Sequence, residues 1–510
     1  MKAKEPTVFL NKPILLTTIN AKWIHPSLAL RLLKTNLGEL EAQCEIIEFA
    51  LRQPLAEKTE PILAARPRIL GISVSIWNHA ATVELFAELE KAWAETKPVV
   101  VLGGPEVSYL PPTTKIFRYA DYVIRGEGEA AFRALCENIL TTERSPRRTV
   151  HIATKFPAQF INAEPVNLSE LKSGYHFYTD EDAAKKLIYV EASRGCPFSC
   201  EFCAGNFVAL GAGNFVARGL SAVKEQGGVP DAEPEGRRTK GLRFPPVREF
   251  ALEPFLAEMD VLVRRGAKTF KFLDRTFNLN IKRTLRICEF FLEKIAEGNA
   301  IVVHFEMVPS LFPPELREIL TRFPPGTLRL EIGVQTLNPE IAARIGRVSN
   351  PEKELENIRF IREKTNAIIH VDLIAGLPGE DIASFGMGFD RLWRVLSGAG
   401  KTEIQLGILK LLPGAPIARH NETFGMRYSL QPPYEVLETS AMSAADIERI
   451  KNFARFWELI VNRRLVNNQA NQPVFDDFMA LSDALFAHFG RNWGIDKSEL
   501  METIVKYLET

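Results

Sequence analysis

The chain has 510 residues, a length typical of about three domains. Hydrophobic residues make up 46% and charged residues 25%, which is globular usage and excludes fibrous and wholly disordered classes. The 63 basic and 63 acidic residues cancel, so no global field favours nucleic acid. The N-terminus lacks a secretory-signal pattern and no apolar run reaches membrane-helix length. We therefore expect a cytoplasmic protein with no membrane partner.

Residues 1–142 alternate short β-rich runs with helical patterns. Strands are predicted at 13–19, 44–49, 69–76, 98–102 and 122–124, and helices at 27–37, 82–96 and 129–140. The third strand, ILGISVSI, is almost continuously apolar, as expected of a parallel strand buried on both faces. This alternation predicts an α/β fold that begins with a doubly wound, Rossmann-like domain.

A second alternation occupies residues 187–416, after a stretch at 143–186 that has no clear period and is predicted to be a linker. Strands are predicted at 187–192, 269–273, 301–306, 328–334, 368–375 and 403–409, and helices at 247–265, 281–297, 314–322, 351–364 and 383–396. Six such repeats predict a partial (β/α)6 barrel, in which ligands bind at the C-terminal ends of the strands.

Residues 204–243 interrupt the second alternation. The segment AGNFVALG is nearly repeated as AGNFVARG, and a Gly-, Pro- and charge-rich run follows. Two readings stand, a surface insertion that arose by recent duplication or a flap that faces the substrate. Arg237, Arg238 and Lys240 form a basic patch there, which is more typical of a solvated loop than of a phosphate site.

Residues 417–510 are predicted to form a helical C-terminal domain. Ser443 and Asp446 have capping-box spacing, and apolar residues then recur at helical intervals. Another capped helix is predicted at 496–508. The domain either only packs against the barrel or closes over the active site and selects the substrate.

Three of the six cysteines lie within eight residues, just beyond the first predicted barrel strand. Cys196, Cys200 and Cys203 have the spacing C-x3-C-x2-C. Three thiolates can ligate three irons of a 4Fe-4S cluster and leave the fourth iron open for catalysis. A zinc site short of one ligand and a chance cluster are the alternatives, and no second Cys-x-x-Cys pair supports zinc. The other three cysteines, Cys44, Cys136 and Cys288, are expected to be buried thiols.

This loop, with its aromatic residue before the last cysteine, resembles the cysteine loop of the radical S-adenosylmethionine (SAM) superfamily. The resemblance implies that the three cysteines hold a 4Fe-4S cluster and that the open iron chelates SAM. One electron would then cleave SAM to methionine and a 5′-deoxyadenosyl radical. The resemblance also places Phe202 against the adenine.

Later segments resemble the same family in order. Asp274 stands where the family's Gly-Gly-Glu motif binds the methionine amino group, and it resembles the Asp-containing version of the cobalamin-binding branch. Glu306 and Gln335 end the next two strands, where each is either a SAM contact or an ordinary polar strand end. Gly376 and Gly379 lie in a stretch that resembles the strand supporting the adenine.

Two glycine-rich loops stand out in the first domain, Gly-Gly-Pro-Glu at 103–106 and Gly-Glu-Gly-Glu at 126–129. Alone, they are weak signals and more typical of generic turns. Ahead of a radical SAM barrel, they resemble the cobalamin-binding domain of that branch. The resemblance implies a cobalamin site at the loops of this domain, formed by Asn20, Ser73, Ser75, Gly103, Gly104, Pro105, Glu106, Gly126, Glu127, Gly128 and Glu129.

The Asp-x-His-x-x-Gly motif that supplies a lower axial histidine in other cobalamin proteins is absent. His25 lies in the matching loop, but it has no Asp two residues before it and no Gly three residues after it. We expect a loop or capping role for His25. The lower axial ligand of cobalamin would then be water or another group, or the position would be empty.

The resemblance implies three cofactors, a 4Fe-4S cluster, SAM and cobalamin, and an activity that methylates an unactivated carbon of an unknown, small-molecule substrate. The alternatives are a cobalamin-dependent radical rearrangement, cyclisation or oxidation, and a non-catalytic cobalamin or redox sensor. A nucleic-acid substrate is a further alternative, which salt-dependent RNA binding would reveal. An electron donor such as flavodoxin or ferredoxin is the expected partner. No catalytic residue is predicted beyond the cofactor contacts.

Overall fold

The computed structural model describes residues 12–93, 96–141, 158–203, 247–398, 402–465 and 474–508. The predicted insertion at 204–243, with its basic patch, lies outside these residues. The chain divides into two compact units, which are described separately. The first comprises Met1–Pro197, Ala204–Ala251 and Arg264–Ala267, and the second comprises Phe198–Cys203, Leu252–Val263 and Lys268–Thr510. Within the described ranges, no helix is both long and apolar enough to cross a bilayer.

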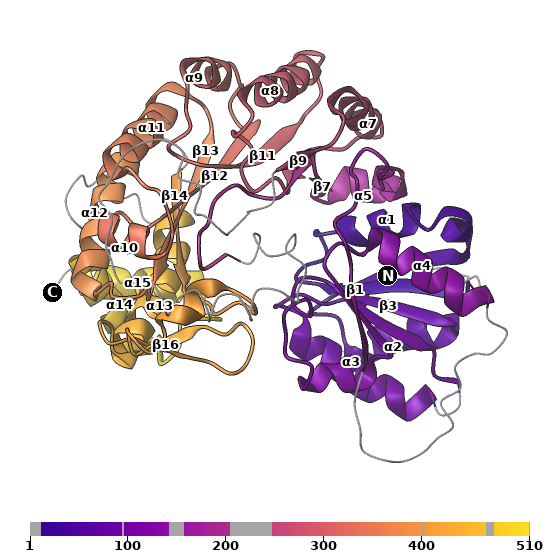
Figure 1. Ribbon diagram of the computed structural model, residues 1–510. Coiled ribbons are helices and arrows are strands. Elements are labelled where there is room, and N and C mark those ends of the chain that lie inside the picture. Colours follow the sequence, from indigo (N-terminus) through magenta and orange to yellow (C-terminus); the bar gives the residue numbers. More distant parts are fainter. Residues whose placement is uncertain are drawn as a thin grey trace, which may run out of the picture. The chain divides into compact units, whose positions relative to one another are not determined.

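A parallel six-stranded sheet forms the centre of the first unit (Figure 1). Its strands are β1 (Ile14–Asn20), β2 (Cys44–Ala50), β3 (Ile69–Ser73), β4 (Val99–Gly103), β5 (Tyr122–Arg125) and β6 (Gln159–Asn162), in the spatial order β2-β1-β3-β4-β5-β6. In a sheet of this order, β2 is added on one side of β1 and the later strands are added on the other side, starting with β3. Ligands of doubly wound sheets bind at this switch point between β1 and β3.

Each face of this sheet has its own apolar core. Helices α1 (Leu28–Thr35) and α4 (Gly128–Thr141) cover one face, where Leu30 and Phe132 join the cluster around Leu16. The other face is covered by α2 (Leu55–Ala65) and α3 (His79–Trp93), whose apolar side chains pack on alternate residues of the same strands. Burial on both faces explains why the strands read as continuous apolar runs.

Helix α2 and strand β6 of this unit were not predicted from the sequence. Helix α2 carries Pro61 in its interior, and a proline there removes a helical hydrogen bond and argues against a helix. Strand β6 lies within the stretch predicted to be a linker and extends the sheet beside β5. The unit also contains α5 (Asp180–Lys185), β7 (Ile188–Val190) and the two-residue strands β8 (Ser193–Arg194) and β9 (Arg248–Glu249).

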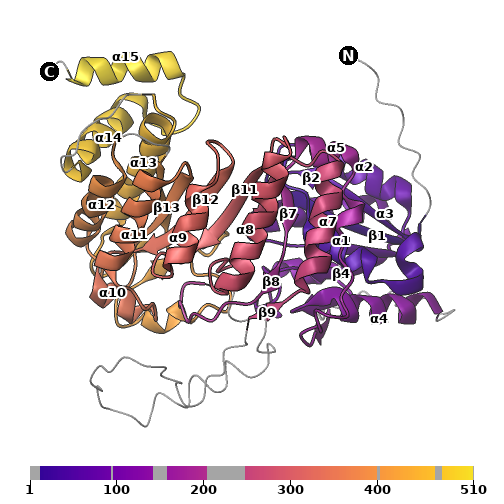
Figure 2. The same cartoon turned by 90° about the horizontal axis from the view of Figure 1, so that it is seen from above.

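In the second unit, parallel strands are wrapped by helices on their outer side (Figure 2). The strands are β10 (Thr269–Phe272), β11 (Val302–Met307), β12 (Leu328–Gln335), β13 (Ile368–Ala375) and β14 (Thr402–Ile408), in consecutive order. The helices are α7 (Leu252–Arg264), α8 (Ile281–Ala296), α9 (Pro314–Thr321), α10 (Pro339–Arg344), α11 (Pro351–Lys364) and α12 (Ile382–Leu396). The predicted β/α repeats are thus confirmed, except that the helix predicted at 247–265 begins at Leu252 and that α10 was not predicted.

Burial alternates along these strands, so the two faces of the sheet differ. In β11, Val303, Phe305 and Met307 are fully buried, and the residues between them are only partly buried. Strands β10, β12 and β13 alternate in the same way, and their less buried positions are largely polar. The apolar face packs under the helices, which leaves a polar face inside the curve of the sheet.

Helices α13 (Ala444–Trp457), α14 (Phe475–Phe489) and α15 (Lys497–Leu508) end the chain. The predicted capping box is present, because Ser443 and Asp446 each bond the other's backbone amide. Trp457 stacks on Phe453 at 5.7 Å and meets Phe389 of α12 edge-on at 4.8 Å. This aromatic core fixes α13 against the barrel helix α12, which supports the packing role for the C-terminal helices.

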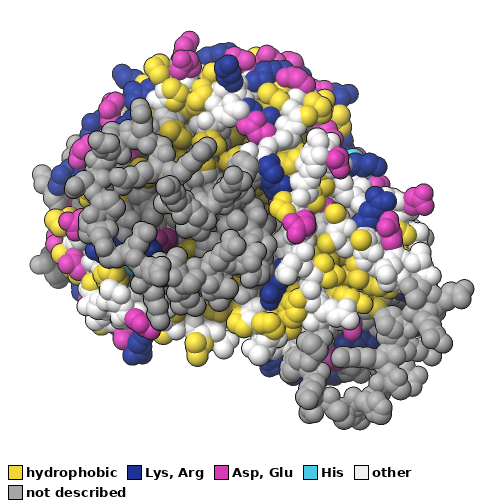
Figure 3. All heavy atoms as spheres, viewed as in Figure 1, with side chains coloured by type: hydrophobic (Ala, Val, Ile, Leu, Met, Phe, Trp, Pro, Cys, Tyr) yellow, Lys and Arg dark blue, Asp and Glu magenta, His cyan; other side chains and the backbone are white. Residues whose placement is uncertain are grey.

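Charge on the surface is mixed. On the face drawn in Figure 3, the described basic and acidic side chains are interspersed along the edge of the molecule. The interspersion agrees with the zero net charge of the sequence.

Candidate cofactor sites

The loops that follow β1, β3, β4 and β5 lie at one edge of the first sheet, because parallel strands all end on the same side. Asn78 organises two of them. Its buried side-chain amide donates to Thr18 Oγ1 at 3.2 Å and to the Ile19 carbonyl at 3.0 Å, and its Oδ1 accepts from the Ser75 amide at 2.8 Å. Asn78 was not predicted from the sequence, because its partners in β1 are 60 and 59 residues away.

Gly104 brings the loop after β4 against the loop after β3. Its φ of +103° lies in the region that favours glycine. A Cβ at this position would stand 2.5 Å from the Val74 carbonyl oxygen and 3.1 Å from Ser73 Oγ. The predicted residues Ser73, Gly103 and Gly104 are therefore brought together, with the backbone of one loop pressed on the other.

The neighbouring acid, Glu106, turns into the protein. It is 3% exposed, and its carboxylate is 2.9 Å from His79 Nδ1. Asn20, at the end of β1, donates to Glu48 at 3.4 Å. Both side chains thus have partners inside the unit, and the neighbouring Pro105 is exposed.

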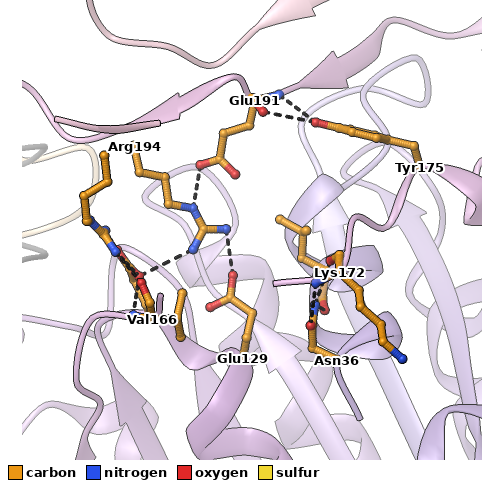
Figure 4. Close-up of polar contacts among 10 residues, drawn as sticks. Asn36, Glu129, Val166, Lys172, Tyr175, Glu191 and Arg194 are labelled. Atoms are coloured by element: carbon orange, nitrogen blue, oxygen red, sulfur yellow. Dashed lines mark hydrogen bonds and ion pairs between the residues drawn. The ribbon is translucent and has the colours of Figure 1, made fainter. Parts of the chain in front are cut away.

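The Gly126–Glu129 turn is engaged by arginine (Figure 4). Arg194 donates from Nη2 to Glu129 at 2.7 Å, from Nη1 to Glu127 at 3.5 Å and from Nε to Glu191 at 2.7 Å. Burial alone would lower the pKa of Arg194, but Glu191 and Glu129 raise it, so the guanidinium stays charged. The carboxylates of Glu127 and Glu129, which the resemblance placed at the cobalamin site, therefore bind arginine.

His25 has a partner as well. Its Nδ1 lies 2.8 Å from the Tyr189 hydroxyl, and the two rings are 6.0 Å apart. The observed contact agrees with the expected loop role for His25.

The second half of the cysteine loop, Phe198–Cys203, is bound to two later segments of the chain. The Glu201 amide donates to the Ile345 carbonyl at 3.0 Å, and the Ser199 hydroxyl donates to the Gly346 carbonyl at 3.0 Å. From the other side, the Ile417 amide donates to the Glu201 carbonyl at 3.1 Å. The backbone of this loop is thus fixed by the segments after α10 and β14.

Arg347 links the loop to the barrel. Its Nη2 donates to the Gly333 carbonyl in β12, and its Nη1 lies 3.9 Å from Cys200 Sγ. A guanidinium beside a cysteine sulfur favours the thiolate, which is the form that binds metals. The position of Arg347 was not predicted, because its sequence distance from Cys200 is 147 residues.

The donor atoms fit an iron–sulfur cluster in chemistry. Cys196, Cys200 and Cys203 are half-buried, and Phe202 beside them is half-buried too. Among the described residues, no three Cys, His, Asp or Glu side chains are gathered as a metal-binding group. The three sulfurs would come together when the cluster binds, because metal sites commonly form only around their metal. The other three thiols are fully buried, as expected, and burial raises the pKa of Cys44 to about 12.

The polar face of the barrel sheet carries a charged ladder. Lys271 of β10 and His304 of β11 lie 3.0 and 3.1 Å from the same oxygen of Glu331 in β12. The His304 hydrogen bond, supported by Lys271, lowers the pKa of Glu331 to about 2. This carboxylate is therefore ionised at every physiological pH.

Acids further along the strands behave differently. Burial, followed by repulsion from Glu331 and Glu306, raises the pKa of Asp372 to about 7. The pKa of Glu306 is also raised, mainly by burial. Asp274, just beyond β10, is 3% exposed and adds to the repulsion on Glu306. The predicted SAM contacts Asp274 and Glu306 thus repel each other, and the charges of Arg275 and Lys271 offset part of the repulsion on Glu306.

Gln335 ends β12 in an unusual conformation. Its φ is +71°, which is strained for a residue with a side chain, and the pairing with β13 shifts register there. Its side-chain nitrogen lies 2.5 Å from where a Cβ on Gly333 would be. Strained backbone of this kind is frequent at functional sites, and a SAM contact by Gln335 stays a prediction.

The two glycines of the predicted adenine strand are packed closely by later segments. At Gly376 a Cβ would meet Val436 at 2.5 Å, and at Gly379 it would meet Arg344 at 2.4 Å and Phe424 at 2.8 Å. Glu380 is buried beside them and accepts from Thr336 at 2.6 Å, and burial raises its pKa to about 7. Both glycines are thus required by packing.

Two family models match the chain in the order that the two sheets predict. The B12 binding domain matches residues 14–136, and the radical SAM superfamily matches residues 190–390. The chain is a cobalamin-binding radical SAM family member. The first match covers β1 to β5 with their glycine loops, and the second runs from β7 into α12 and includes the three cysteines.

Curated relatives of this family member are distant in sequence. An uncharacterized methyltransferase of Pyrococcus horikoshii is 24% identical over 52% of this chain and 51% of its own. The cobalamin-dependent radical SAM methyltransferase TokK of Streptomyces tokunonensis is 21% identical over 73% of this chain and 51% of its own. A 2-(S-pantetheinyl)-carbapenam-3-carboxylate methyltransferase of Streptantibioticus cattleyicolor is 24% identical over 69% and 48%. The chain thus spans about half the length of these relatives.

Solved structures of cobalamin and SAM enzymes share the fold of this family member. The methyltransferase TsrM of Kitasatospora setae, with tryptophan and a SAM analog bound, has a TM-score of 0.59 at 17% identity, covering 92% of this chain and 96% of its own. OxsB with aqua-cobalamin and SAM bound has a TM-score of 0.60 at 15% identity, covering 98% and 75%. The predicted α/β architecture is confirmed.

Proposed function

We propose that this protein is a cobalamin-dependent radical SAM methyltransferase. The observation that carries the proposal is the three-cysteine loop, held by backbone bonds to Ile345 and Ile417 and placed after a domain matching the B12 binding model. The curated relatives that bear a functional name are methyltransferases, which favours methyl transfer over the other radical outcomes.

When bound, the cluster would supply the electron that cleaves SAM, and cobalamin would supply a carrier for the methyl group. Cys196, Cys200 and Cys203 would hold the cluster, with Arg347 favouring the thiolate of Cys200. Asp274 would offer its carboxylate to the SAM ammonium group, and Glu306 and Gln335 would contact the ribose or the carboxylate of SAM.

The proposed cobalamin site lies at the edge where the loops after β1, β3, β4 and β5 meet. Gly103 and Gly104 present backbone without side chains there, which permits a bulky planar ligand to approach closely. Since Glu106, Glu127 and Glu129 are held by His79 and arginines, they contribute to this site by fixing the loops. The substrate is proposed to be a small molecule.

Anaerobic reconstitution tests this function. The chain is loaded with iron and sulfide, then given hydroxocobalamin, SAM and a reductant such as flavodoxin with its reductase. We expect cobalamin uptake by absorbance, and 5′-deoxyadenosine and S-adenosylhomocysteine by chromatography. The Cys200→Ala variant should lose both products, and Cys288→Ala, whose thiol is buried away from solvent, should keep them.

The products also separate the alternatives. Deoxyadenosine without S-adenosylhomocysteine would indicate a radical rearrangement, cyclisation or oxidation. Cobalamin uptake without SAM cleavage would indicate a sensor. Neither uptake nor cleavage by the wild type would end the proposal.

A further inference from the structure

Arg194 lies between two parts of the first unit to which we assign different cofactors. It is two residues before Cys196 in the chain, and its guanidinium binds carboxylates of the Gly126–Glu129 turn. The contact joins segments 65 and 67 residues apart in sequence. Within this unit, the contact connects the proposed cobalamin loops to a residue two positions before a proposed cluster ligand.

The contact is built as a network and is not a lone surface pair. The side chains of Arg194, Glu127, Glu129 and Glu191 are 11, 8, 9 and 14% exposed. Each nitrogen of the Arg194 guanidinium faces a different carboxylate (Figure 4). The planar guanidinium fork fixes the directions of its partners, which a lysine ammonium does not.

A second arginine completes the network. Arg248 binds both oxygens of Glu127 and donates to the Val166 carbonyl at 2.7 Å, and the Val166 amide donates back to Glu127 at 2.9 Å. Arg248 and Arg194 are register partners in the antiparallel pair of β8 and β9. Backbone pairing and side-chain charge therefore hold Arg194 on the same carboxylate.

Removing one member would leave buried charge without a partner. Three carboxylates and two guanidiniums share this space, so the acids already exceed the arginines by one. Buried ionic networks often contribute little net stability, and their best-attested use is to specify one geometry. The geometry specified here is the direction in which the chain leaves β8 toward Cys196.

We propose that Arg194 is a positioning residue that couples the Gly126–Glu129 turn to Cys196, so that cobalamin and the cluster influence each other's binding. The inference rests on the proposed function. By linkage, if the cluster tightens cobalamin binding by a given factor, cobalamin alters cluster binding by the same factor. A moderate coupling of this kind is about fivefold or more.

The experiment measures cobalamin affinity with and without the cluster. Full-length wild-type chain is titrated with hydroxocobalamin anaerobically, by absorbance, before and after iron–sulfur reconstitution. We expect the two dissociation constants to differ by about fivefold or more, and the electron paramagnetic resonance spectrum of the reduced cluster to change when cobalamin is added. In Arg194→Gln, both differences should disappear while iron content is kept, and Arg194→Lys should restore only part of them.

Controls keep the test decisive. Arg265→Gln removes an arginine that pairs with the exposed Asp180 in the same unit, and it should leave the coupling intact. If circular dichroism shows that Arg194→Gln does not fold, Glu129→Gln carries the test, because it removes one partner and leaves the arginine bound to Glu191 and Glu127.

Wild-type coupling retained in the folded variants would overturn the inference, and so would equal affinities in the wild type. In both cases the proposed function would stand. A wild type that takes up neither iron nor cobalamin would instead overturn the proposed function.

Discussion

The Arg419 guanidinium donates to both oxygens of Glu201, at 2.9 and 2.5 Å, from 218 residues further along the chain. His420 adds a contact to the same carboxylate at 2.9 Å. Glu201 separates Cys200 from Phe202, so this clamp holds the centre of the proposed cluster loop. The acid is 8% exposed and is thus largely shielded from water.

Replacing Glu201 by Gln should loosen the loop without removing a ligand. We expect the free energy of unfolding to fall by about 1–3 kcal/mol, the value of charge-assisted bonds, and SAM cleavage to slow by roughly 10–100-fold through misplacement. Urea unfolding and deoxyadenosine release measure the two effects. Arg427→Gln is the control, because the exposed Arg427–Glu438 pair should be worth less than about 1 kcal/mol. Unchanged cleavage would refute a positioning role for the clamp.

Gly346 tests the other attachment of the loop. With a φ of +68°, it leaves no room for a Cβ, which would lie 2.7 Å from the Ser199 carbonyl oxygen. Gly490 has a similar φ of +61° with open space around it. We expect Gly490→Ala to cost about 1 kcal/mol of backbone strain, and Gly346→Ala to cost about 1–3 kcal/mol more. Only Gly346→Ala should reduce iron loading, and equal loading in the two variants would contradict the prediction.

Gly104 offers a matched test of the cobalamin loops. Its Cβ would clash with Val74, whereas Gly298, with a φ of +95°, has nothing within 4 Å. Gly104→Ala should push the loops after β3 and β4 apart and weaken cobalamin binding by about tenfold, which is about 1.4 kcal/mol. Gly298→Ala should bind cobalamin as the wild type does. Titration by absorbance compares them, and equal affinities would place the site elsewhere.

The raised pKa of Asp372 predicts that the stability of the protein depends on pH. Its pKa of about 7 in the folded state exceeds the ordinary value of 3.8, so folding favours the protonated form. The wild type should lose stability from this group as the pH rises from about 4 to about 7, after which the loss is complete. Asp372→Asn should remove this loss, and its advantage over the wild type should grow over that range to no more than about 4 kcal/mol.

Unfolding free energies between pH 4 and pH 8 measure the effect of Asp372→Asn. Asp477→Asn, at the exposed first turn of α14, is measured alongside it over the same range. A difference between Asp372→Asn and the wild type that stays constant over this range would contradict the prediction.

The local pattern of apolar and polar residues predicted most elements, because burial of a strand or helix face requires apolar residues at regular intervals in the sequence. The strand at 44–49 was predicted from its β-rich run and became Cys44–Ala50, and the helix at 351–364 was predicted to the residue. Helix α2 was not predicted because Pro61 in its interior argues against a helix from local sequence. In the fold, burial of the neighbouring Ile62 stabilises the helix despite the proline. Strand β6 was missed because its stability comes from pairing with β5, which is a non-local contact.

The sequence by itself determined the two α/β repeats, the three-cysteine loop and the order of the two domains, since spacing and periodicity are properties of neighbouring residues. Only the tertiary structure decided which charges meet. In the fold, Glu127 and Glu129 bind Arg194, Glu201 binds Arg419, and Cys200 lies beside Arg347. These pairs are separated by 65 to 218 residues, and a buried charge is satisfied by whichever partner the fold brings within reach.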